Sequence, residues 1–341
     1  MTHDNASLRQ AEDVVRGLIG TPAEVEHLSS GGRNSRIYHV RSKAGEFALK
    51  QYPSRADDLR DRLSTEVGAL NLMERYQIDV VPRVAGVDRS RGFALLTWID
   101  GSVVTDVVDA DIDAAIKFLK AIHALRSTPW AKEQPAAAEA CLSGAEVQRQ
   151  ILGRLARLQS LQDEERLASF LKRDLGPVIQ HEIANAKAKS AAVDLDFTAD
   201  LPQEWQSLVP SDFGFHNSLR RKDGTLAFVD FEYFGWDDPV KLSADIMLHP
   251  GRALAAPQRR HFRQLARLLY GEDPSFTKRL DVYLPLFGLR WVLILLNEFI
   301  PERWSARVRA GARETWPQAK AKQLSLASEF LAALSGKIKD Q

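Results

Sequence analysis

Three side chains with oxygen ligands are grouped around one short stretch of the chain. Asp212 and Asn217 lie in "SDFGFHN", and Asp230 follows the apolar run "LAFV". Between them, Asp223-Gly224 is a strong signal for a β-hairpin. The hairpin would bring two carboxylates and an amide oxygen to one of its ends. Such hard oxygen ligands suit Mg²⁺, and hence a polyphosphate, while Asp212 is free to take the proton of a hydroxyl group.

A lysine and a glutamate form the second candidate pair. Lys50 ends the apolar run "EFALK", where a lysine is usually an exposed edge charge. The following helical pattern has an apolar stripe, and Glu66 falls within it. An ionised carboxylate on a buried face is costly unless it is paired, which predicts an ion pair between Glu66 and Lys50. Glu74 is a weaker alternative, because it lies in the last turn of the helix, closer to solvent.

A glycine-bearing turn precedes the lysine, in "SSGGRNSRIYHV". Gly31 and Gly32 let backbone N–H groups approach a phosphate without obstruction by side chains, and Asn34 could add a donor. The turn matches neither the dinucleotide pattern GxGxxG nor the Walker pattern GxxxxGK(S/T). By itself it is a weak indication of phosphate binding, because hairpin glycines are common.

Short elements must position these residues. The patterns predict a helix over 6–19, strands between 24 and 51, a helix over 57–76 and a strand pair between 84 and 99. Beyond residue 101 helical patterns continue to the end, interrupted by the hairpin of 217–231. The segment 131–205 is rich in alanine and charge, is helical in pattern and has no motif. We therefore expect an α+β chain with most of its strands in the first hundred residues.

The composition indicates a soluble protein of two lobes or domains. The 341 residues are 45% hydrophobic and 27% charged, with a net charge of +1 that points neither to nucleic acid nor to an anionic membrane. The single cysteine, Cys141, excludes an intrachain disulfide. The N-terminus has no apolar signal region, and the most apolar run, "WVLILL", is too short for a membrane helix. We expect a cytoplasmic protein; its oligomeric state is not indicated.

In their order along the chain, these motifs resemble the aminoglycoside phosphotransferase and choline kinase family, which has a protein-kinase-like fold. "LLTWIDG" is similar to the hinge of that family, "SDFGFHN" to its catalytic loop and "VDFEYFGWDDP" to its metal segment. "DFEY" is especially similar to choline and ethanolamine kinases. The resemblance covers about 28–250. It also implies that the letters DFG at 212–214 are misleading, because the counterpart of that kinase triplet is Asp230-Phe231-Glu232.

The resemblance implies a division into two lobes and a reaction. The N-lobe, 1–98, would hold an antiparallel sheet and one helix. The larger, mostly helical C-lobe, 99–341, would contain the catalytic loop 210–217 and the metal segment 229–239. The activity would be the Mg²⁺-dependent transfer of the γ-phosphate of ATP or GTP to a hydroxyl group of a small molecule.

Site residues follow from the same resemblance. Asp212 would be the catalytic base, and Asn217 and Asp230 would hold Mg²⁺. Lys50, positioned by Glu66, would contact the α- and β-phosphates of the nucleotide. The remaining nucleotide contacts would be Gly31, Gly32 and Asn34 over the phosphates and the hinge from Leu96 to Trp98 beside the base. The candidate substrate contacts are His216, Glu232, Tyr233, Trp236 and Asp237; the last two could instead brace the turn in which they lie.

The sequence departs from the family pattern at two points. Pro210-Ser211 stands where the family usually has His-Gly before the catalytic aspartate, which bears on the geometry of the loop. Asp245 comes later after Asp238-Pro239 than the family's second aspartate, and we expect it to anchor the catalytic loop from a helix.

Several alternatives for activity and acceptor stay open. A protein kinase is disfavoured, because no activation loop and no APE motif follow Asp230. A catalytically silent nucleotide-binding or scaffold protein would be expected to lack Lys50, Asp212, Asn217 or Asp230. All four residues are present. An aminoglycoside needs an acidic patch, and choline needs an aromatic cage, which Tyr233, Trp236 and Trp291 could supply. A sugar or related metabolite needs neither, so we rank it first, then an amino alcohol, then an aminoglycoside.

Overall fold

Five antiparallel strands form the N-terminal sheet, in the order β1-β2-β3-β5-β4. The computed structural model describes residues 2–28, 35–54, 58, 60–309, 312 and 314–339. The strands are β1 (Ala23–His27), β2 (Arg36–Ser42), β3 (Gly45–Gln51), β4 (Val84–Asp88) and β5 (Phe93–Thr97). The strands and the strand pair predicted from the sequence are thereby confirmed.

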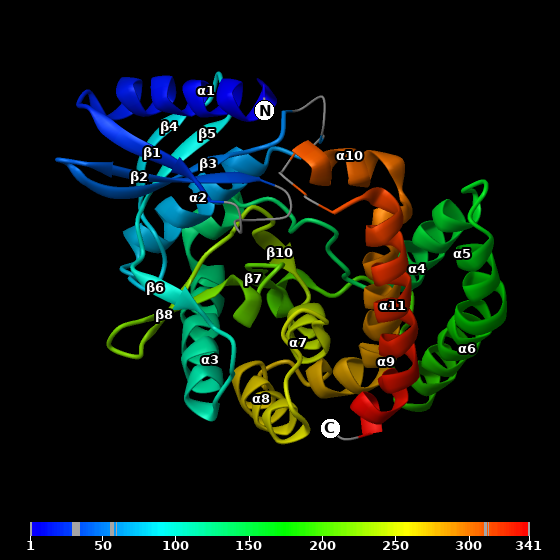
Figure 1. Ribbon diagram of the computed structural model, residues 1–341. Helices are drawn as coiled ribbons and strands as arrows, with labels where there is room; N and C mark the ends of the chain where they lie inside the picture. Colours follow the sequence, from blue (N-terminus) through cyan, green and yellow to red (C-terminus); the bar gives the residue numbers. More distant parts are fainter. Residues whose placement is uncertain are drawn as a thin grey trace.

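The two faces of the sheet have different partners. Helix α1 (Thr2–Ile19) covers the outer face, where Val14 and Val15 pack against buried side chains such as Leu49. Figure 1 shows α1 lying across the strands. Because side chains alternate along a strand, Lys50 and Leu96 face the opposite side, toward helix α2 and the rest of the chain.

Helix α2 (Arg62–Arg75) begins later than the predicted start at residue 57. Asp61 caps it by accepting a hydrogen bond from the N–H of Ser64 at 3.0 Å. Asp58, which the sequence pattern places inside the helix, instead accepts hydrogen bonds from Arg60 and Arg62. The prediction was wrong at this end because periodicity does not show which acidic residue acts as the cap.

Two small sheets follow the N-terminal sheet. The predicted hairpin is confirmed as β8 (Ser218–Arg221) and β9 (Leu226–Phe228), and the unpredicted β6 (Gly101–Val103) adds a third strand. A Cβ atom on Gly101 would lie 2.9 Å from the carbonyl oxygen of Arg220, so glycine permits this approach. β7 (Ser207–Val209) pairs with β10 (Gly235–Asp237) and supports the segment on either side of the hairpin.

Helices make up most of the remaining chain, as the sequence predicts. The longer ones are α3 (Asp109–Ala124), α4 (Gly144–Gln159), α6 (Gly176–Ala192), α7 (Pro239–Leu248), α8 (Ala256–Leu269), α9 (Phe276–Leu295), α10 (Pro301–Arg309) and α11 (Trp316–Lys339). The shorter α5 (Glu165–Phe170) precedes one π-helical turn, 171–175, and short 3₁₀ turns lie at 125–127, 129–133, 203–205, 215–217 and 296–299. The residues of 131–143 and 193–205 are mostly non-helical, unlike the prediction for 131–205.

Helix α9 is the central element of the helical part. It packs against α4, α6, α7 and α11, and Figure 1 shows it behind α11. With the turn that follows, Phe276–Phe299 is long and apolar enough to cross a membrane, but 72% of its most apolar window is buried inside the protein. Its hydrophobicity is accounted for by its place in the core.

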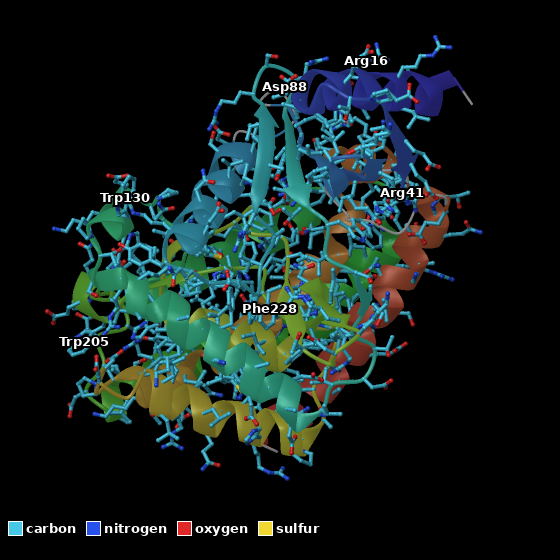
Figure 2. The ribbon with its side chains drawn as sticks, turned by 90° about the vertical axis from the view of Figure 1, so that its left-hand side faces the viewer. Arg16, Arg41, Asp88, Trp130, Trp205 and Phe228 are labelled. Carbon is cyan, nitrogen blue, oxygen red and sulfur yellow. The ribbon has the colours of Figure 1, made fainter. Side chains whose placement is uncertain are left out.

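One aromatic cluster lies beneath the catalytic-loop segment. Phe228 stacks on Phe118 with ring centroids 4.7 Å apart, and Phe213 packs against both rings. In Figure 2 Phe228 lies centrally, whereas Arg16, Arg41 and Asp88 lie at the periphery. Phe213 is 3% exposed, so its role in "SDFGFHN" is that of a core aromatic.

Candidate active site

Lys50 lies at the centre of a buried cluster of carboxylates. Its Nζ is 2.6 Å from Glu66 Oε2, 2.6 Å from Asp230 Oδ1 and 3.3 Å from Glu232 Oε2. The predicted Lys50–Glu66 ion pair is therefore confirmed. Glu74, the alternative partner, is largely exposed and lies near Arg83 instead.

Glu66 connects helix α2 to the segment that carries Asp230. Its Oε1 accepts a hydrogen bond from the backbone N–H of Phe231 at 3.2 Å, and its Oε2 accepts one from the Tyr52 hydroxyl at 2.8 Å. The side chain is 1% exposed, so these bonds and Lys50 compensate its burial. Tyr52 was not identified from the sequence, because its hydroxyl reaches Glu66 only in the folded sheet.

The carboxylates outnumber the lysine at this point, which makes the cluster a candidate cation site. Oxygen atoms of Glu66, Asp230 and Glu232 all lie within 4.8 Å of one another. Burial, with the repulsion from Glu232 and Glu66, raises the pKa of Asp230 to about 7 against the opposing attraction of Lys50. The backbone φ of Asp230 is 72°, a left-handed conformation that costs energy for a residue with a side chain.

Asn217 lies beside the same segment, as the hairpin predicts. Its carbonyl oxygen accepts from the N–H of Val229 at 3.0 Å, one residue before Asp230. Its side-chain Nδ2 donates to the carbonyl oxygen of Asp212 at 2.8 Å. No described residue donates a hydrogen bond to its Oδ1, so the amide oxygen remains available as a ligand.

Asp212 presents an ionised carboxylate to the cleft. Its side chain is 36% exposed and accepts a hydrogen bond on Oδ1 from His216 Nε2 at 3.2 Å. Desolvation would raise the pKa of Asp212, but the bond from His216 and the nearby cationic groups hold it well below its usual value. The preceding residue, Ser211, has a φ of 66°, so the backbone is strained at this point as well.

His216 stacks on His249, a residue that the sequence did not single out. The two ring centroids are 3.8 Å apart with an interplanar angle of 4°, and Trp291 meets His249 edge to face at 4.7 Å. Ligand atoms of Asp212, His216 and His249 lie within 4.8 Å of one another. The parallel rings nevertheless direct their in-plane lone pairs side by side, not toward one point, so this trio does not fit a metal ion.

Glu232 and Tyr233 are both engaged with arginines. Glu232 is 3% exposed, forms an ion pair with Arg62 and accepts from the Ser35 hydroxyl at 3.1 Å. The ring of Tyr233 faces the guanidinium groups of Arg60 and Arg62 at 5.1 and 5.0 Å. Tyr233 lines the cleft, whereas the carboxylate of Glu232 is held on the side of Lys50.

Trp236 and Asp237 lie away from the cleft. The indole Nε1 of Trp236 donates to the carbonyl oxygen of Ala131 at 2.8 Å. Asp237 is fully buried and accepts from the backbone N–H groups of Cys141 and Asp238 at 2.7 and 2.8 Å. Neither residue is among those that line the cleft. Both brace the end of the metal segment, which is the second of the two roles considered for them.

The predicted hinge lies at the end of β5. Leu96 is paired with Ala48 on one side and Val84 on the other, within the sheet. The N–H of Trp98 donates to the carbonyl oxygen of Glu46 at 3.2 Å, and its ring stacks on His39 at 3.8 Å. The predicted phosphate-loop residues Gly31, Gly32 and Asn34 lie outside the described residues.

A cleft of about 2040 Å³ runs past Asp212. Its walls come from β3, α2, the catalytic loop and the helices α4, α7, α9, α10 and α11. Asp245 lies in it on α7 and is 3.2 Å from Lys241, whose Nζ is 3.4 Å from the hydroxyl of Ser211. Asp245 therefore reaches the catalytic loop through Lys241.

A family model described as the phosphotransferase enzyme family matches residues 24–241, more than half of the chain. This range includes all the residues to which the motifs assign catalytic, nucleotide or metal roles. The resemblance stated from the motifs is thereby confirmed. No curated protein matches the chain by sequence.

Solved structures share the fold at low sequence identity. An ethanolamine kinase of Plasmodium vivax is 12% identical with a TM-score of 0.60, covering 96% of this chain and 88% of that one. Choline kinase LicA of Streptococcus pneumoniae is 14% identical with a TM-score of 0.59, covering 95% and 98%. Spectinomycin phosphotransferase APH(9)-Ia, solved with ADP and spectinomycin, is 12% identical with a TM-score of 0.64, covering 96% and 98%. The predicted protein-kinase-like fold is confirmed.

Proposed function

The chain belongs to the phosphotransferase enzyme family, and we propose from this premise that it transfers the γ-phosphoryl group of ATP or GTP to a hydroxyl group of a small molecule. The observation that carries the proposal is the meeting of three elements at one point. Lys50 from the sheet, Glu66 from α2 and Asp230 after the hairpin are joined by ion pairs, and Asn217 connects this segment to Asp212.

Asp212 would act on the acceptor. The hydroxyl oxygen attacks the γ-phosphorus, the bond from that phosphorus to the β–γ bridging oxygen breaks, and the nucleoside diphosphate leaves with the electron pair. The hydroxyl proton passes to Asp212, whose carboxylate is accessible from the cleft and ionised at neutral pH. His216 fixes the carboxylate through its hydrogen bond, so that the free oxygen can be directed at the acceptor.

The nucleotide would lie between the sheet and the catalytic loop. Lys50 is the cation suited to its α- and β-phosphates, and Glu66 keeps the lysine in place. The base would lie near the stacked rings of His39 and Trp98 at the end of β5, where we also propose the boundary between the lobes 1–98 and 99–341. ADP in the spectinomycin phosphotransferase structure supports a nucleotide co-substrate.

Asn217 and Asp230 would hold Mg²⁺. Their amide and carboxylate oxygens suit this ion, and the excess of carboxylates around Lys50 means that an added cation relieves repulsion. When bound, the ion neutralises charge on the phosphates. The left-handed conformation of Asp230 is consistent with a backbone shaped for this purpose.

The geometry favours a sugar-like acceptor over choline. The ring of Tyr233 already faces two guanidinium groups, and Trp236 lies outside the cleft. Of the residues considered for a cage, only Trp291 and Tyr233 reach the cleft. We retain a cytoplasmic location in the proposal, with which the burial of the apolar helix Phe276–Phe299 inside the protein does not conflict.

A catalytically silent protein on the same fold is the alternative, and one experiment separates the two. Binding of Mg·ATP is measured by calorimetry, and ADP formation is followed with a panel of hydroxyl-bearing metabolites. We expect Asp212→Asn to keep the affinity for Mg·ATP and to lose roughly 10²-fold or more in kcat. Full activity in that variant would exclude Asp212 as the base, and an absence of Mg·ATP binding would favour the silent alternative.

A further inference from the structure

We propose that the acceptor carries an oxyanion, a carboxylate or a phosphate, which is received by a guanidinium cluster formed by Arg154, Arg290 and Arg303. This inference rests on the proposed function, because it concerns the acceptor side of the same cleft. It differs from the cationic acceptors considered above, the amino alcohols and aminoglycosides. The three arginines come from three helices, α4, α9 and α10, and all line the cleft.

One carboxylate is shared by two members of the cluster. Glu139 Oε2 lies 2.5 Å from Arg154 Nη2 and 2.6 Å from Arg290 Nη2. Glu139 has a φ of 57°, so a strained backbone holds it where the two guanidinium groups meet. Glu139 alone therefore does not balance the charge of the two arginines.

Arg303 adds a third positive charge without a carboxylate of its own. Its half-buried side chain forms no ion pair or hydrogen bond with any other described residue. The neighbouring Glu302 is engaged elsewhere, with Arg157 at 2.9 Å. Burial lowers the pKa of Arg154; Glu139 opposes this shift, whereas the positive charges of Arg290 and Arg303 add to it. An anion placed among the three would relieve this repulsion.

Helix α10 holds Arg303 over the cleft. The carbonyl oxygen of Arg309, at the end of α10, accepts from Arg36 Nε on β2 at 2.7 Å. Figure 1 shows α10 next to the N-terminal part of the molecule, at the upper end of α11. The helix therefore lies between the sheet and the helical part, where an acceptor would enter.

A chain of contacts connects the cluster to the catalytic loop. Arg290 Nη1 lies 3.9 Å from Asp245 Oδ1, and Asp245 Oδ2 lies 3.2 Å from Lys241 Nζ. Lys241 in turn contacts the hydroxyl of Ser211, the residue before Asp212. An acceptor whose anionic end is held by the arginines would thus present its other groups toward Asp212.

Trp291 provides an independent observation that points to an oxygen-rich ligand. Its side chain is 9% exposed and lines the cleft, yet its Nε1–H has no hydrogen-bond partner among the described residues. An unpaired buried donor is costly, and an oxygen atom of a bound ligand would compensate it. Trp291 follows Arg290 in α9, and both residues line the cleft.

The charge of the whole cleft agrees with this inference. The described residues that line it include thirteen arginine and lysine side chains and eight carboxylates, on a chain whose net charge is only +1. Part of this excess faces the nucleotide side and suits its phosphates. An excess of this sign opposes a polycationic acceptor.

Inorganic anions test the cluster without knowledge of the natural acceptor. The enzyme is saturated with Mg·ADP, so that its nucleotide phosphate sites are filled, and is then titrated at low ionic strength with phosphate and, separately, with malonate. We expect one saturable site, with the stronger of the two anions indicating whether the acceptor carries a phosphate or a carboxylate. We expect Arg303→Gln to weaken that binding by at least about tenfold and Arg303→Lys to weaken it less.

A matched control removes the same charge elsewhere. Arg166 on α5 is exposed and does not line the cleft, so Arg166→Gln should leave the anion affinity unchanged. An equal loss of anion affinity in Arg303→Gln and Arg166→Gln would overturn the inference, and so would the absence of saturable binding of either anion. Tight binding of choline or spectinomycin in place of the anions would also overturn it. If Mg·ADP itself does not bind, the proposed function fails, while titration of the free protein still tests the cluster.

Discussion

The ammonium group of Lys50 lies 2.6 Å from the carboxylate of Asp230, although 180 residues separate them in the chain. The contact joins the sheet to the segment that follows the hairpin. A nucleotide whose phosphates lie between the two residues would replace this ion pair by contacts of its own, with the phosphates on Lys50 and the metal on Asp230. Glu66 would keep the lysine in position during that exchange, since it binds Lys50 and the backbone N–H of Phe231 at once.

Glu66→Gln tests this holding role. The variant loses the buried charge opposite Lys50 and weakens the bond to Phe231. We expect the free energy of unfolding to fall by about 1.5–3 kcal/mol and the KM for ATP to rise. Glu74→Gln is the matched control, because Glu74 is exposed and should change the free energy by no more than about 0.5 kcal/mol. Urea unfolding and initial rates measure both quantities, and equal effects of the two variants would contradict the assignment.

Asp230→Asn should weaken the Mg²⁺-dependent binding of ATP without lowering the thermal stability of the protein. The substitution removes one of three carboxylates crowded around Lys50, so we expect the Tm to stay equal or to rise. The same change removes the charged oxygen ligand, so Mg²⁺-dependent binding of ATP should fall by at least about tenfold. Calorimetry with and without Mg²⁺ measures the loss, and Asp223→Asn at the exposed hairpin tip is the control. Unchanged affinity for Mg·ATP would exclude Asp230 as a ligand.

The sequence alone was sufficient to predict those contacts of the site that follow from local sequence patterns. A carboxylate in the apolar stripe of α2 predicts a buried partner, and Lys50 is that partner. An Asp-Gly turn predicts a hairpin, and a hairpin brings the residues at its two ends together, as Asn217 and Val229 show. These inferences depend only on alternation, helical periodicity and turn chemistry.

The remainder of the site depends on contacts between distant segments. Arg62 pairs with Glu232, and His216 stacks on His249, without any spacing that would reveal either contact. The segment 131–205 has no motif, yet it supplies Glu139 and Arg154 to the cleft. The position of Arg154 follows from how α4 packs on α9, and a single sequence carries no signal for that packing.

His249→Ala tests whether the stacked rings position Asp212. Removing His249 leaves His216 without its stacking partner, so the hydrogen bond to Asp212 should become less well directed. We expect kcat to fall roughly tenfold to a hundredfold while the KM for ATP stays within about twofold. His261→Ala, at an exposed ion pair with Asp113, is the control. A change confined to the KM for ATP would contradict a positioning role.

His123 should make stability depend on pH in the mildly acidic range. Burial, with the nearby charge of Arg126, lowers the pKa of His123 from 6.5 to about 4 in the folded protein. Above pH 6.5 the residue is neutral in both states, whereas below it the unfolded chain binds the proton first. Stability is therefore lost as the pH falls from about 6.5 to about 4.

When the pH is lowered from 7.5 to 5, protonation of His123 in the unfolded chain should reduce the free energy of unfolding by about 1–2 kcal/mol. The His123→Gln variant should not show this reduction. The Gln side chain can still meet the hydroxyl of Ser207, which His123 Nδ1 contacts at 2.9 Å. Urea unfolding at the two pH values measures the difference, and His181→Gln on the exposed side of α6 is the control. If the wild type and His123→Gln lose the same free energy between the two pH values, the depressed pKa of His123 does not govern the acid sensitivity.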